Sequence, residues 1–131
     1  MKVDALSSPL DVLAVSDETL TNAASRMRYN DVGCVPVVDG GALVGILTER
    51  DLSRAVADGA DPHRRTVAEY MTSDPIVIPS SCEARDAARV MIDAGVRHLP
   101  IVDNGRLLGV ISIRDIVAEL LFTGEWAAPR N

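Results

Sequence analysis

The chain has 131 residues and is 47% hydrophobic, which is enough for one compact core and too short for two ordinary domains. Its formal net charge of −6 and pI near 4.8 argue against nucleic acid or an anionic membrane as a partner. No apolar run approaches the roughly 20 residues of a membrane span, so we expect a soluble cytoplasmic protein. Cys34 and Cys82 lack CxxC spacing, which argues against a disulfide framework and against a metal cluster.

The second half of the sequence repeats the first. A shift of 64 residues aligns residues 3–52 with residues 67–116 without a gap, and eight of the 16 residues in 36–51 are identical to their partners. A repeat of this length predicts one module built from two copies of the same unit. We expect a first repeat, a linker, a second repeat and a tail at residues 3–58, 59–66, 67–122 and 123–131.

Each repeat is predicted to begin with a short leading segment, a brief apolar strand and a helix. The strands are expected at 12–15 and 76–78. Ser16 and Ser80 stand where an N-cap belongs, and Ser80 has a glutamate three residues later, as in a capping box. Apolar residues then recur at helical spacing, up to Met27 in one copy and Met91 in the other.

The second part of each repeat is predicted to be a hairpin followed by a helix. Strands at 34–38 and 98–102 each contain a proline, and the turns Asp39-Gly40-Gly41 and Asp103-Asn104-Gly105 suit positive φ. Returning strands and final helices follow, at residues 42–47 and 49–58 in one copy and 107–111 and 113–121 in the other. The faces expected to be buried on these helices comprise Leu52, Ala55 and Val56, and Ile116, Val117 and Leu120.

Each repeat is thus a β-α-β-β-α unit, and the predicted fold class is α+β. A repeat with a single three-stranded sheet would leave one face of the sheet bare. We therefore expect the two copies to bury these faces on each other about a pseudo-twofold axis.

One motif occurs in both repeats, as Gly45–Asp51 and as Gly109–Asp115. In each copy an apolar strand ends at a hydroxyl residue, a helix begins, and an acid lies three residues after the hydroxyl. Two interpretations are open. Free backbone N–H groups and a hydroxyl at a helix start can bind phosphate, whereas the same spacing also forms a capping box that needs no ligand.

The phosphate interpretation assigns the hydroxyls of Thr48 and Ser112 to the phosphate. Arg50 and Arg114, in the first turn of the same helices, could each add a guanidinium fork.

These motifs, together with Val35–Asp39 and Leu99–Asp103, make the chain resemble the cystathionine-β-synthase (CBS) domain pair, or Bateman module. The resemblance covers residues 3 to about 122 and is to the stand-alone type. It implies that an adenosine derivative binds in the cleft between the copies and that modules pair into dimers. It implies a regulatory ligand such as AMP, ADP, ATP or S-adenosylmethionine and no obligatory cofactor.

The same resemblance assigns roles to individual residues. Asp51 and Asp115 would bind ribose, since a carboxylate has two acceptor oxygens for two adjacent hydroxyls. The adenine wall of the Ser112/Asp115 site would come from Val12, Val32, Gly33 and Cys34, with Ser7 or Ser8 nearby. The wall of the Thr48/Asp51 site would come from Ile76, Val96, Arg97 and His98, with Met71 and Thr72.

The two predicted sites differ where Gly33-Cys34 in one copy matches Arg97-His98 in the other. Arg97 is either a further phosphate contact or an exposed arginine in a salt bridge. His98 is either a donor to phosphate or a half-buried histidine. The apolar Gly33-Cys34 wall suits a purine, and we expect the Ser112/Asp115 site to be filled if only one is.

The functional prediction is a sensor protein that binds an adenosyl ligand and acts as a homodimer, with a possible protein target. Catalysis is not expected, because the sequence has no recognisable nucleophile, base and acid set and no metal cluster. The alternative is a structural dimerisation scaffold that binds no ligand.

Overall fold

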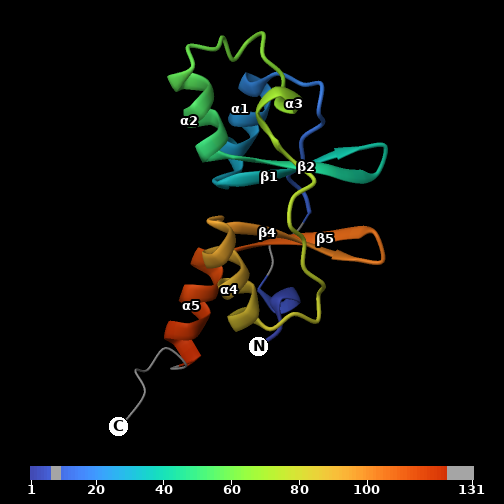
Figure 1. Ribbon diagram of the computed structural model, residues 1–131, viewed down its shortest axis with the longest axis vertical. Helices are drawn as coiled ribbons and strands as arrows, with labels where there is room; N and C mark the ends of the chain where they lie inside the picture. Colours follow the sequence, from blue (N-terminus) through green and yellow to red (C-terminus); the bar gives the residue numbers. More distant parts are fainter. Residues whose placement is uncertain (7–9, 124–131) are drawn as a thin grey trace. The chain divides into compact units, whose positions relative to one another are not determined.

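The computed structural model describes residues 1–6 and 10–123, which form helices and antiparallel strands (Figure 1). The elements in chain order are a 3-10 helix Val3–Ala5, α1 Leu20–Asn30, β1 Cys34–Asp39, β2 Ala42–Thr48, α2 Glu49–Ala57, α3 Val67–Tyr70, β3 Thr72–Ser73, α4 Ala84–Ala94, β4 His98–Asp103, β5 Arg106–Ser112 and α5 Ile113–Thr123. The predicted α+β class is confirmed. Within the described ranges, none of the helices combines the length and the apolar character that crossing a membrane requires.

The chain forms two compact units that do not coincide with the sequence repeats. The repeat-1 unit spans Leu10–Ile76, and the repeat-2 unit combines the described residues before position 10 with the chain from Val77 onward. The short segments that begin the two repeats, at Val3 and at Val67, explain this difference. Val3 is completely buried in the core that contains Met91, and Val67 is completely buried in the core that contains Leu20.

The repeat-1 unit contains a sheet in the order β1-β2-β3, covered on one face by helices (Figure 1). The turn between β1 and β2 has φ of 56° at Gly40 and 81° at Gly41, a conformation that glycine adopts without strain. The core under α1 is formed by apolar residues at helical spacing, and Met27 belongs to it as predicted.

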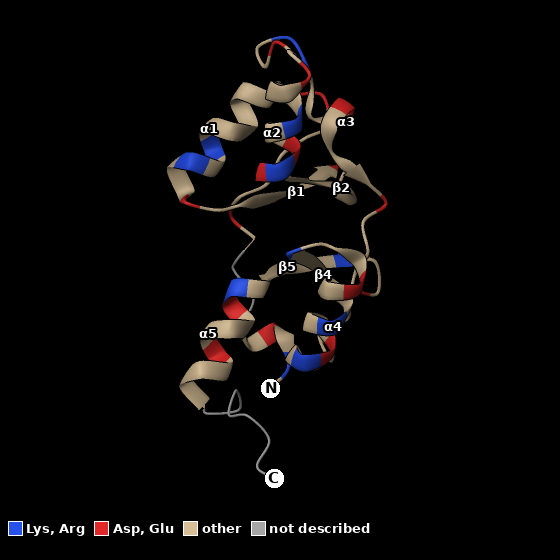
Figure 2. Cartoon of the chain, turned by 60° about the vertical axis from the view of Figure 1, so that its left-hand side comes forward, with Lys and Arg blue, Asp and Glu red and all other residues tan. Residues whose placement is uncertain are grey.

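The repeat-2 unit has the same plan with two strands, β4 and β5, and with α4 and α5 on one face (Figure 1). Its turn has φ of 50° at Asn104 and 77° at Gly105, so both predicted hairpins are confirmed. Figure 2 shows that β1, β2, β4 and β5 are almost free of charged residues, which lie mainly on helices and loops. Met91 is buried in this core, as expected.

The strands predicted at 12–15 and 76–78 are wrong, because each contributes only one bridging residue. Ala14 pairs with Val37, and Ile78 pairs with Ile101, in both cases parallel. The next bonds of these two ladders would need the N–H groups of Ser16 and Ser80, which are donated to Asp39 and Asp103 instead.

The predicted N-caps of the first helix in each repeat are also wrong. Thr19 caps α1 by accepting the N–H of Asn22, and Glu83 precedes α4 without a side-chain cap. Ser16 instead donates its N–H and its hydroxyl to Asp39, at 3.0 and 2.5 Å. Ser80 makes the same two contacts with Asp103. In each unit these hydrogen bonds tie the serine to the start of the hairpin turn, 23 residues later. They also lower the pKa of the Asp39 and Asp103 carboxyls.

The final helices match their predicted ranges to within two residues, but of the six predicted face residues three are only half-buried and one is exposed. Ala55 and Ile116 are buried as expected, whereas Val56 is 76% exposed. Val56 lies one residue after Ala55, about 100° around the helix from that buried side chain.

Gly45, the glycine of the repeated motif, lies where another segment approaches closely. A Cβ atom at this position would be 2.6 Å from Met71 Sδ and 2.8 Å from the carbonyl oxygen of Thr72. We expect Gly45→Ala to push β3 away from β2 and to lower the free energy of unfolding by about 1–3 kcal/mol. Urea unfolding measures this loss. Ala42→Gly, at the exposed start of the same strand, is the control for strand propensity, and an equal loss in both variants would contradict the steric explanation.

The serine–aspartate contacts predict a specific pH dependence. A carboxyl whose pKa is lowered in the folded state stabilises the fold above its ordinary pKa of 3.8, and this stabilisation is lost as the pH falls through the lower folded value. The double variant Ser16→Ala/Ser80→Ala should therefore be less stable than the wild type at pH 7, and the difference should shrink at pH 3. Urea unfolding at both pH values checks this, with Ser53→Ala as the control. A difference independent of pH would show that the two carboxylates are not involved.

Candidate functional site

The repeated motif forms a capping box where β2 meets α2, which we call the first junction. Thr48 Oγ1 accepts the N–H of Asp51 at 3.3 Å, and Asp51 Oδ2 accepts the N–H of Thr48 at 2.8 Å. The Thr48 hydroxyl also lies 3.1 Å from Asp51 Oδ2. Asp51 is only 5% exposed, so this carboxylate is part of the folded framework.

The second junction, where β5 meets α5, has the same reciprocal bonds. Ser112 donates its N–H to Asp115 Oδ2, and its hydroxyl accepts the N–H of Asp115, both at 3.1 Å. Asp115 is half-buried rather than buried. The capping interpretation therefore holds at both junctions, and ribose and phosphate binding stay predictions.

The two junctions differ in what reaches the second carboxylate oxygen. Arg54 Nη2 lies 3.0 Å from Asp51 Oδ1 and also donates to the carbonyl oxygen of Tyr70 at 2.9 Å. The residue that matches Arg54 in the second repeat is Ala118, which has no polar side chain. Within the described part of the chain, Asp115 Oδ1 forms no ion pair that corresponds to the one between Asp51 and Arg54.

Each junction is flanked by a residue of the preceding strand in its own unit. Cys34 pairs with Thr48, and His98 pairs with Ser112. The carbonyl oxygen of Gly33 accepts the N–H of Glu49 at 3.0 Å, and that of Arg97 accepts the N–H of Ile113 at 2.8 Å. The sequence assigned each of these wall residues to the motif of the other repeat, and this assignment stays a prediction.

The remaining predicted site residues vary in exposure. Val12 and Val32 are half-buried against the repeat-1 core, and Cys34 is buried. Ile76 is 51% and Val96 38% exposed. Of the other predicted site residues, Arg50, Thr72, Arg97 and Arg114 are exposed, whereas Gly33, Thr48, His98 and Ser112 are half-buried. Ser7 and Ser8 lie outside the described residues.

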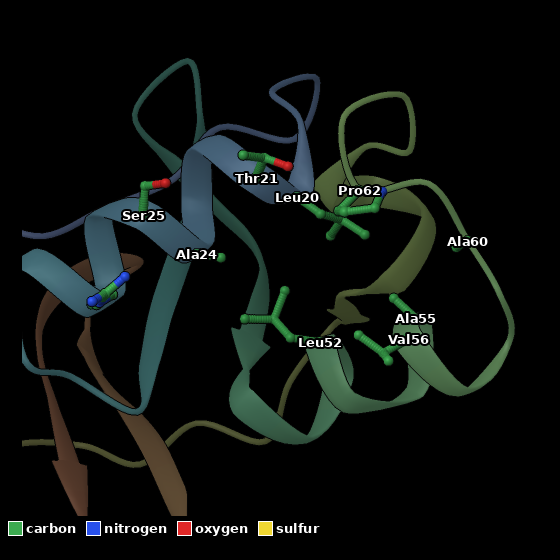
Figure 3. Close-up of a pocket in the computed structure, with 10 residues that line it drawn as sticks. Leu20, Thr21, Ala24, Ser25, Leu52, Ala55, Val56, Ala60 and Pro62 are labelled. Atoms are coloured by element: carbon green, nitrogen blue, oxygen red, sulfur yellow. The ribbon is translucent and has the colours of Figure 1, made fainter.

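A cavity of about 350 Å³ lies between α1 and α2 of the repeat-1 unit (Figure 3). Its lining is mostly apolar and includes none of the predicted site residues; it comprises Leu20, Thr21, Ala24, Ser25, Arg28, Leu52, Ala55, Val56, Ala60 and Pro62. Within residues 1–6 and 10–123, no three His, Cys, Asp or Glu side chains gather as a metal site requires.

Arg54 is the residue at the candidate site that sequence reasoning missed. The sequence does contain a sign of this difference. When the two repeats are aligned with an offset of 64 residues, Arg54 matches Ala118, and each lies three residues after the aspartate of the repeated motif. An i,i+3 pair of opposite charge is common on helices, so the pattern alone does not distinguish this contact from an exposed ion pair.

Comparison with known proteins places these features in one family. A family model described as CBS domain matches residues 7–58 and again residues 67–121. An uncharacterised 17.7 kDa protein of Acidianus ambivalens is 36% identical over 124 residues, which cover 92% of this chain and 73% of that protein. Hypoxic response protein 1 of Mycobacterium tuberculosis is 33% identical over 105 residues, which cover 79% of this chain and 73% of that protein.

A solved structure extends the similarity to a complex with ligands. The CBS domain pair of protein MJ0100, in complex with 5′-methylthioadenosine and S-adenosyl-L-methionine, superposes with a TM-score of 0.84 at 28% identity. The match covers 95% of this chain and 98% of that chain.

The different surroundings of the two aspartates predict different contributions to stability. Asp51→Ala removes a buried, charged acceptor of several hydrogen bonds and should lower the free energy of unfolding by about 2–3 kcal/mol. Asp115→Ala removes a half-buried capping partner and should cost about 1 kcal/mol. Denaturant unfolding of both variants measures the difference, with the exposed Asp93→Ala as the control. Equal losses at the two junctions would contradict the structural difference between them.

Proposed function

Because the chain belongs to the CBS domain family, we propose that it is a regulatory protein that binds an adenosine-containing ligand. The complex of MJ0100 with 5′-methylthioadenosine and S-adenosyl-L-methionine supports this class of ligand, since its CBS pair matches nearly the whole of this chain. AMP, ADP, ATP and S-adenosylmethionine are the candidates. All of them carry the ribose diol that a carboxylate recognises.

The observation that carries the proposal is that the Asp115 carboxylate is held in position but is only partly used by the fold. This carboxylate is fixed at a helix start by the N–H of Ser112, and it is half-buried rather than enclosed. Among the described residues, no arginine engages its Oδ1 in the way that Arg54 engages the corresponding oxygen of Asp51. A carboxylate held in place with acceptor capacity to spare is suited to two adjacent hydroxyls.

The groups around the second junction support a ligand that carries phosphate as well as ribose. Ser112 lies at the N-terminus of α5, where backbone N–H groups and the helix dipole favour an anion. Arg114 is exposed in the first turn of this helix. His98 pairs with Ser112 on the neighbouring strand and can supply a further donor.

We also propose that two copies associate and that the ligand changes a surface presented to a protein target. Large apolar side chains on the helices support self-association, because Val56 in α2 is 76% exposed and Phe122 in α5 is 90% exposed. The proposed role is regulatory and cytoplasmic, without catalysis, and membership of the CBS domain family supports its regulatory part.

The second candidate function is a dimerisation scaffold that binds no ligand. The first junction favours the scaffold function, since both oxygens of the Asp51 carboxylate already have partners within the chain. If Asp115 serves only to cap α5, the second junction fits this function equally well.

A thermal-shift series against AMP, ADP, ATP, NADH and S-adenosylmethionine tests the proposal. A ligand present at about 100 times its Kd should stabilise the folded protein by about 2.7 kcal/mol, which raises the melting temperature by several degrees. Asp115→Asn keeps the size of the side chain but replaces one acceptor oxygen by a donor. We expect it to abolish the shift.

Asp93→Asn is the matched control, because this exposed acid lies in α4 of the same unit. Flat melting curves for all five compounds, together with a dimer in sedimentation analysis, would favour the scaffold. An unchanged shift in Asp115→Asn would show that the ligand does not use this carboxylate.

A further inference from the structure

We propose that Arg54 is a latch that keeps the first junction closed to ligand, so that each chain binds one adenosyl ligand, at the second junction. This inference rests on the proposed function and specifies which of the two repeated motifs performs it. It assigns Arg54 a specificity-determining role, although Arg54 is not expected to touch the ligand bound at Asp115.

The latch acts on the oxygen that a ribose would need. Asp51 Oδ2 accepts the N–H of Thr48 and lies within hydrogen-bonding distance of its hydroxyl. Asp51 Oδ1 is engaged by the Arg54 guanidinium at 3.0 Å. Both oxygens of this carboxylate therefore have partners, and the side chain is only 7% exposed. A diol could bind only by displacing Arg54.

The guanidinium of Arg54 is held by a second contact. Its Nη2 also donates to the carbonyl oxygen of Tyr70, at the end of α3. The hydroxyl of Tyr70 in turn donates to Asp58 Oδ2 at 3.2 Å. Arg54 is thus fixed between α2 and α3, and displacing it breaks two hydrogen bonds, although its side chain is 57% exposed.

Each part of the latch is missing from the repeat-2 unit. Ala118 matches Arg54, Leu6 matches Tyr70, and Phe122 matches Asp58. The guanidinium, the phenol and the acceptor carboxylate are all replaced by apolar groups. The same motif is therefore latched in one repeat and unlatched in the other.

Removing the latch should change the number of ligands bound per chain. Calorimetric titration with AMP and with S-adenosylmethionine should give one site per chain for the wild type and two for Arg54→Ala. The double variant Arg54→Ala/Asp115→Asn should again bind one, now at Asp51. A hydrogen bond to a charged group corresponds to an affinity difference of about tenfold to hundredfold, and this is the expected gain at the first junction.

The reverse substitution tests the same idea without removing any native contact. Ala118 is exposed, so an arginine side chain fits there, and Ala118→Arg should weaken binding at the second junction about tenfold to hundredfold. Arg65→Ala is the matched control, since it removes an exposed ion pair with Glu69 near α3 and leaves Asp51 untouched. This control should bind one ligand per chain.

The outcomes separate the latch from the proposed function. Two sites in the wild type, or one unchanged site in Arg54→Ala, would overturn the latch while leaving ligand binding intact. Binding of either probe by Arg54→Ala alone would support the latch and overturn the assignment of the open site to Asp115. If neither the wild type nor Arg54→Ala binds either probe, both proposals fall for these ligands.

Discussion

The reciprocal hydrogen bonds at the two strand-to-helix junctions are the interaction on which the candidate site depends. A hydroxyl and an acid three residues apart bind each other's backbone N–H, which ends the strand and begins the helix at a defined residue. The same bonds fix the carboxylate in position. In the proposed function a ribose would need the same carboxylate oxygens as the helix cap, so the acceptor capacity that remains would decide whether a junction binds a ligand.

The parts of the fold that the sequence predicted are those governed by local rules. Both hairpins follow from two-residue turns with positive φ, and the helix cores follow from apolar residues at helical spacing. The helix starts were wrong because Ser16 and Ser80 bind aspartates 23 residues away, and a capping pattern contains no information about such a competitor. The leading segments pack in the unit of the other repeat, which a repeat period alone does not reveal.

For the candidate site, the sequence supplied the motif, the acids and the capping alternative, and the structure confirmed the capping geometry at both junctions. The sequence alone did not reveal that the two acids, Asp51 and Asp115, have different hydrogen-bond partners. Asp51 and Asp115 occupy identical positions in the alignment, and the contact that separates them comes from a side chain three residues later. Which wall residues complete a site depends on the placement of one repeat against the other, and no local pattern specifies that placement.

Duplication of one motif allows the two copies to serve different needs. The first junction satisfies its acid internally, and this strengthens the attachment of α3 to α2 through Arg54 and Tyr70. Among the described residues, the second junction lacks that ion pair, which leaves Asp115 Oδ1 available as an acceptor. A group that binds a ligand must leave some of its bonding capacity unused in the free protein, and this makes a binding site less stabilising than its structural twin. In the proposed function, the exchange of arginine at position 54 for alanine at position 118 divides the roles of the two acids.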